Sequence, residues 1–117
     1  MSSFMSSSGE PYAVSLESIE LARDRIKDHI HRTPVQTCET MNSISGRNLY
    51  FKCEFLQKAG SFKARGACNA VMKSTAEAFV THSSGNHGQA LAWAAKKKGL
   101  PAYVVMPTNS PLCKQRA

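Results

Sequence analysis

Two short polar segments contain the residue types that could do chemistry in this chain. The first, GSFKARGA at residues 60–67, places Lys63 directly after the apolar Phe62. A lysine amine can attack an aldehyde or act as a general base where its surroundings favour the neutral form. A lysine one turn into a helix is, however, most often a solvated surface residue. The segment by itself leaves both interpretations of Lys63 open.

The second segment, THSSGNHG at residues 81–88, combines glycines with short polar side chains. The glycines would let backbone N–H groups approach a ligand closely, and the N-terminus of a following helix favours an anion such as a carboxylate or phosphate. Serine, glycine and asparagine are also the residues of ordinary capped loops. An anion site and a plain loop are therefore equal alternatives for this segment.

The elements that must position these segments alternate along the chain. Apolar residues at helical spacing predict a helix from Ser15, its N-cap, to about Ile30, and a two-residue alternation predicts a strand over 48–54. The same criteria predict a helix over 62–73 capped by Ser61, a strand at 79–81, a helix over 86–98, a strand at 102–106 and a new helix from Pro111. This order predicts a three-layer α/β fold with a parallel, doubly wound sheet, and both polar segments at its carboxyl edge.

The domain organisation expected from the sequence is simple. Residues 1–12 are rich in serine and predict a disordered tail, and residues 13–117 predict a single domain. The predicted last helix stops before its second turn, so we expect the chain to be the N-terminal part of a longer domain.

Composition argues against several functional classes. The net charge is +7, but the basic residues are scattered, and the one run, at 96–98, suits a helix C-terminus, so no nucleic-acid partner is expected. No apolar run is long enough for a membrane span, and no secretory signal is recognisable. The four cysteines and four histidines lack metal-ligand spacing, so we expect reduced thiols, no metal site and a cytoplasmic location.

At these residues the sequence resembles a known family. NLYFKCE at 48–54, Gln57-Lys58 and the two polar segments are similar to the serine racemase and threonine dehydratase family, pyridoxal-phosphate (PLP) enzymes of the tryptophan-synthase-β fold type. The resemblance implies that Lys63 holds PLP as a Schiff base and that Asn86 hydrogen-bonds the ring hydroxyl of the cofactor. It also implies that the backbone from Ser83 to His87 binds the substrate carboxylate.

The residue at position 84 bears on the choice of reaction within that family. Similar threonine dehydratases usually carry alanine there, whereas serine racemases carry a serine facing the lysine across the cofactor. Racemisation needs acid/base groups on both faces of Cα, while elimination needs only one base to begin. Ser84 with Lys63 therefore favours a serine racemase with serine and threonine dehydratase side activity. A hydroxyaspartate or threonine dehydratase is the alternative.

The resemblance implies further properties of the full-length form. These are activation by ATP and Mg²⁺, with Gln89 and Lys58 at nucleotide-contacting positions, and a homodimer. The segment between Val71 and Val80 is shorter than in relatives, so the preceding helix is expected to be shortened or repacked. The loop that binds the PLP phosphate would lie beyond Ala117, so we expect the chain to be inactive alone. In a different class, it would be a non-catalytic truncated product or an interaction module.

Overall fold

The structure is a computed structural model, and it describes residues 13–116. The elements in chain order are α1 (Leu16–Ile26), β1 (Val35–Gln36), α2 (Glu39–Ser45), β2 (Phe51–Lys52), two 3₁₀ turns (Glu54–Leu56 and Lys58–Gly60), α3 (Lys63–Lys73), β3 (Phe79–His82), α4 (Asn86–Lys98), β4 (Ala102–Val105) and α5 (Leu112–Gln115). This mixture of helices and strands confirms the predicted α/β class. The tail predicted at 1–12 lies outside the described residues.

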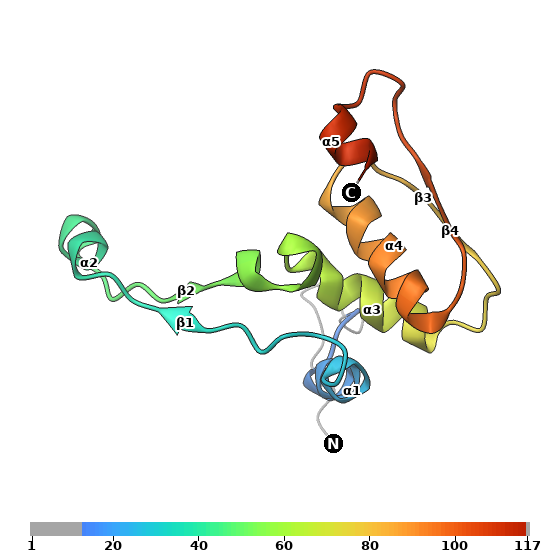
Figure 1. Cartoon of the computed structure of the whole chain (residues 1–117). Coiled ribbons are helices and arrows are strands. Elements are labelled where there is room, and N and C mark those ends of the chain that lie inside the picture. The colour runs from blue at the N-terminus through green and yellow to red at the C-terminus, as the bar shows by residue number, and fades with distance from the viewer. Residues whose placement is uncertain (1–12, 117) are drawn as a thin grey trace.

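Strands β3 and β4 form the predicted parallel pair, connected through α4 (Figure 1). Phe79 pairs with Ala102 at one end and His82 with Val105 at the other. Side chains alternate along both strands between half-buried and exposed. One face of the pair therefore lies against the body of the protein, and the other is open to solvent.

Strands β1 and β2 form a separate antiparallel pair, which extends with α2 away from the α3–α4 body (Figure 1). The strand predicted at 48–54 is reduced to Phe51–Lys52, and its placement in the parallel sheet was wrong. The N–H of Cys53 donates to Pro34 O at 3.0 Å, and the chain then enters the first 3₁₀ turn. Side-chain alternation indicates a strand but does not specify its partner, which explains the error.

The helix boundaries follow local capping. Ser15 caps α1 as predicted, because its Oγ accepts from Ser18 N at 3.1 Å and its own N–H donates to Ser18 Oγ at 3.0 Å. The helix ends at Ile26 rather than near Ile30, since residues 27–29 form a turn. Helix α4 has the predicted bounds, and Gly99 follows it with a φ of 74°, in the left-handed region that favours glycine.

Helix α2 was not predicted from the sequence. It has only seven residues, too few for a helical repeat to be recognised, and none of its side chains is buried. Its end was predicted as a turn at Ser45-Gly46, and Gly46 has a φ of 65° there.

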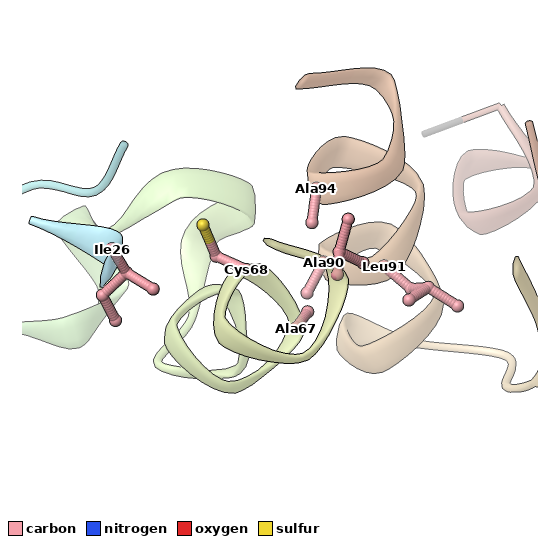
Figure 2. Close-up of a cluster of buried hydrophobic side chains, with 7 residues drawn as sticks. Ile26, Ala67, Cys68, Ala90, Leu91 and Ala94 are labelled. Carbon is pink, nitrogen blue, oxygen red and sulfur yellow. The ribbon is translucent and has the colours of Figure 1, made fainter. Parts of the chain in front are cut away.

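The core lies between α3 and α4, and Figure 2 shows the small side chains that form it. Its buried members are Ile26, Ala67, Cys68, Val71, Ala90, Leu91 and Ala94. Because most of these side chains are short, the two helix backbones can approach closely.

A lysine fixes the C-terminal ends of these two helices. The Lys98 amine donates to Val71 O at 2.9 Å and also to Ser74 O, where α3 ends. Helix α3 therefore reaches Lys73, as the spacing predicts, and its last carbonyls have a partner from α4. Because the ends of the two helices meet here, both helices begin on the same side of the pair (Figure 1).

Candidate active site

Lys63 is the first residue of α3, and its side chain is exposed. Its amine forms no hydrogen bond or ion pair with another described residue. The chain reaches it through a tight turn in which Ala59 and Gly60 have φ of 54° and 65°. The predicted side-chain cap is absent: the Ser61 hydroxyl is buried without a hydrogen-bond partner among the described residues, although Ser61 has the extended conformation typical of an N-cap.

The polar segment after β3 is held by Ser83. Its N–H donates to Val105 O at 2.9 Å, and its Oγ accepts from Gly85 N at 3.3 Å and Gly88 N at 3.1 Å. The Ser83 hydroxyl therefore satisfies two N–H groups around the start of α4. Ser84 is exposed beside it.

Asn86 and His87 begin α4, and both are exposed. Their backbone N–H groups donate to no other described residue. Such groups at the N-terminus of a thirteen-residue helix are suited to an anion.

Gly88 is required by the packing of α4 against β4 and the preceding loop. A Cβ built on it would lie 2.8 Å from Val104 Cγ1 and 3.2 Å from Ser83 O. Any larger residue would push α4 away from β4 and from the loop that precedes it.

Three of the predicted site residues meet at a small cavity of about 130 Å³. Ser83, Ser84 and Gln89 line it, together with Lys114 from α5. Lys58 and Lys63 do not line it, and Lys58 lies in the second 3₁₀ turn, where its N–H donates to Gln57 Oε1 at 2.8 Å. The two predicted nucleotide-contacting residues are therefore not brought to this cavity together. Lys114 was missed, because only the start of its helix was predicted.

An ion pair adjoins the Lys63 segment. Arg65 Nε donates to Glu54 Oε2 at 2.9 Å, and Arg65 Nη2 donates to Glu54 Oε1 at 2.6 Å. Thr33 Oγ1 donates to the same Glu54 oxygen at 2.6 Å. The hydrogen bonds from Arg65, aided by Thr33 and opposed by burial, lower the pKa of Glu54 to about 2. Sequence patterns did not predict this pair, because no local rule connects residues eleven positions apart.

The comparison with known proteins assigns this arrangement to a family. A model of the pyridoxal-phosphate-dependent enzyme family matches residues 26–117. The chain belongs to this family. A serine racemase from Arabidopsis thaliana is 59% identical over 114 residues, which cover 94% of this chain and 34% of the relative.

Solved structures agree with the membership in the PLP-dependent family. Maize serine racemase superposes with a TM-score of 0.86 at 45% identity, covering 90% of this chain and 33% of that protein. The T.th. threonine deaminase superposes with a TM-score of 0.74 at 39% identity, covering 87% and 37%. The chain thus spans about a third of the length of the relatives that it matches.

The donors present fit the cofactor of the family. Lys63 offers an amine with no partner among the described residues, and Ser61 adds a buried hydroxyl that also has none. The start of α4 offers backbone N–H groups to an anion. Within residues 13–116, no group of three or more histidine, cysteine, aspartate or glutamate side chains could hold a metal ion. No helix in this part of the chain is long and apolar enough to cross a membrane.

Proposed function

We propose that this chain supplies the cofactor lysine and the second acid/base residue of a serine racemase. The observation that carries the proposal is the placement of Lys63 and of the segment 83–87 at the starts of two packed helices. The similarity to serine racemases supports it. Since the chain spans about a third of these relatives, the complete activity is proposed for a full-length protein.

Lys63 and Ser84 would have separate roles in the racemisation. Bound PLP would withdraw electrons from the substrate Cα, which makes its proton removable. Lys63 would hold the cofactor, and its freed amine would take that proton on one face of the substrate. The Ser84 hydroxyl would return a proton on the opposite face, which inverts the configuration.

The remaining residues of the segment would bind and orient. The Asn86 side-chain amide would donate to the ring hydroxyl of the cofactor. Of the backbone from Ser83 to His87, the N–H groups of Ser84, Asn86 and His87 would bind the substrate carboxylate at the positive end of the α4 dipole. Those of Ser83 and Gly85 already donate to Val105 O and to Ser83 Oγ. Serine or threonine is the proposed amino acid.

A dehydratase is the second candidate, and the similarity to a threonine deaminase favours it. Removal of the Cα proton from serine, followed by loss of the β-hydroxyl and addition of water, gives pyruvate and ammonia. Lys63 alone can start this reaction, so we propose it as a side activity. A hydroxyaspartate or threonine dehydratase is the corresponding main activity if Ser84 takes no part.

We also propose the properties that accompany the resemblance. These are a cytoplasmic homodimer in the full-length form, with ATP and Mg²⁺ as activators. Half-buried Gln89, at the small cavity, is one candidate nucleotide contact, and Lys58 is the other.

The test uses the chain alone and the same chain grafted in place of the matching residues of the Arabidopsis relative. Each is incubated with PLP and L-serine, and D-serine, pyruvate and ammonia are measured. Lys63→Ala is expected to abolish all three products, and Ser84→Ala is expected to abolish only D-serine. Ser45→Ala, on the distant α2, is the matched control.

The two main candidate functions give different outcomes. Activity of the graft with none from the chain alone supports a racemase whose remaining residues lie outside this chain. An undiminished rate of D-serine formation in the Ser84→Ala graft would overturn the assignment of Ser84 and leave a dehydratase. An inactive graft that folds would indicate the non-catalytic product or interaction module.

A further inference from the structure

We propose that the Glu54–Arg65 ion pair and the left-handed turn at Ala59 form a positioning device for the Lys63 amine. This inference rests on the proposed function of Lys63. It adds residues that act through Lys63 and need not touch the cofactor or the substrate.

The ion pair and the hydrogen bond from Thr33 to Glu54 together connect three segments of the chain. Glu54 lies in the first 3₁₀ turn, Thr33 lies between α1 and β1, and Arg65 lies in the first turn of α3. Two parallel hydrogen bonds from a guanidinium fix direction as well as distance, because both groups are planar. The pair is partly buried, with 32% of the Arg65 side chain and 19% of the Glu54 side chain exposed. The first turn of α3 is therefore held from outside the helix.

A second device holds the chain just before Lys63. Ala59 has φ 54° and ψ 22°, a left-handed conformation that is disfavoured for a residue with a Cβ. Such strain persists where surrounding contacts impose it, and it often occurs at functional sites. Here the Ala59 side chain packs against the core cluster between α3 and α4.

Hydrogen bonds from Gln57 fix the turn that contains Ala59. Its Oε1 accepts from His31 N at 2.9 Å and from Lys58 N at 2.8 Å, and its Nε2 donates to His31 O at 2.7 Å. Its backbone O accepts from Gly60 N at 2.9 Å. The side chain is buried, so these bonds are protected from water. The backbone on both sides of Ala59 is thereby fixed.

These hydrogen bonds and the ion pair matter for Lys63 because no such interaction holds the Lys63 side chain itself. Its amine forms no polar interaction with another described residue, so the direction of the helix start decides where the amine lies. A displacement of about 1 Å at a reacting group can reduce a rate by roughly a hundredfold. Strain maintained next to an otherwise unrestrained lysine points to positioning rather than to stability alone.

The experiment measures which lysine reacts with PLP. The folded 117-residue chain is treated briefly with limiting PLP and then with borohydride, and the labelled lysines are quantified by peptide mass mapping. The readout is the labelling of Lys63 relative to Lys58, as a function of pH. The variants are Glu54→Gln and Ala59→Gly, and Glu77→Gln, at an exposed position, is the control. Circular dichroism confirms that each variant is folded under the labelling conditions.

We expect the wild type and Glu77→Gln to label Lys63 preferentially, and Glu54→Gln to reduce this preference about tenfold. Ala59→Gly relieves the left-handed strain, so it should stay folded up to the same urea concentration as the wild type, while its preference for labelling Lys63 falls. This variant separates positioning from folding, even if Glu54→Gln unfolds. Preferential labelling that survives in folded Ala59→Gly, whether or not Glu54→Gln folds, would overturn this inference alone. No preference in the wild type would overturn it together with the proposed role of Lys63.

Discussion

Gly88 in α4 lies directly against Val104 in β4: a Cβ on Gly88 would stand 2.8 Å from Val104 Cγ1. This contact sets how closely the helix approaches the strand, next to the loop that contains Ser84. We predict that Gly88→Ala lowers the free energy of unfolding by about 1–3 kcal/mol, because the added methyl also meets Ser83 O.

The matched control is Gly66→Ala. Gly66 lies inside α3, and a Cβ there would meet nothing within 4 Å. Alanine is favoured over glycine in a helix interior by up to about 1 kcal/mol, so this substitution should stabilise the protein. Urea unfolding of both variants provides the check. Equal effects of the two substitutions would show that the close approach does not govern stability.

Lys98 and Lys96 carry the same charge at the end of α4 but should differ in their effect on stability. Lys98→Met removes the hydrogen bonds to Val71 O and Ser74 O, so we predict a loss of about 1–2 kcal/mol. Lys96 is exposed, and Lys96→Met should change stability by less than about 0.5 kcal/mol. Thermal unfolding of the two variants compares them directly. If Lys96→Met lowered the stability as much as Lys98→Met, the hydrogen bonds from Lys98 to the end of α3 would not be the cause of the loss.

The Glu54–Arg65 pair makes stability depend on pH in the acid range. The pKa of Glu54 is lowered from 4.5 in the unfolded chain to about 2 in the folded protein. A lowered folded pKa stabilises the protein above pH 4.5, and this contribution is lost as the pH falls through about 2. We expect Glu54→Gln to cost about 1 kcal/mol at neutral pH, since the pair is partly exposed.

The measurement is urea unfolding of the wild type and of Glu54→Gln at about pH 7 and about pH 3. The difference between the two proteins should shrink at the lower pH. A difference that is constant over this range would show that the Glu54 carboxylate contributes nothing through its charge.

The open face of the β3–β4 pair predicts association of the chain with itself. Val80, Tyr103 and Val105 are 73%, 62% and 57% exposed on this face. Both strands pair only with each other among the described residues, so their outer edges are also free to pair. Tyr103→Lys should reduce light scattering without loss of helix, whereas Val104→Lys, on the half-buried face, should unfold the protein. Unchanged light scattering of folded Tyr103→Lys would show that the exposed face of the β3–β4 pair does not mediate association.

Local sequence patterns predicted α3 and α4 well, whereas α2 was missed and α1 ends earlier than predicted. Pairing between distant segments was harder to predict. The bounds of α4 follow from its helical spacing and from Gly99, which are properties of consecutive residues. The partner of the strand around Phe51 depends on Val35 and Gln36, which no pattern near residue 51 specifies.

The residues of the candidate site also differ in whether a local pattern could predict them. Lys63, Ser84 and Asn86 were selected because the contiguous motifs that contain them resemble a known family. Their position at predicted helix starts alone left a surface lysine and a plain loop as alternatives. The Glu54–Arg65 pair and the left-handed Ala59 could not be predicted, because they depend on how the chain folds back on itself. The catalytic roles of Lys63, Ser84 and Asn86 and the positioning role of the Glu54–Arg65 pair remain predictions.

The most direct test of the central proposal is the visible absorbance of the purified chain mixed with PLP, compared among wild type, Lys63→Ala and Lys58→Ala. We predict a band of lysine-bound cofactor in the wild type and in Lys58→Ala that is lost in Lys63→Ala. An equal band in all three proteins, or none in the wild type, would contradict the assignment of Lys63 as the residue that holds the cofactor.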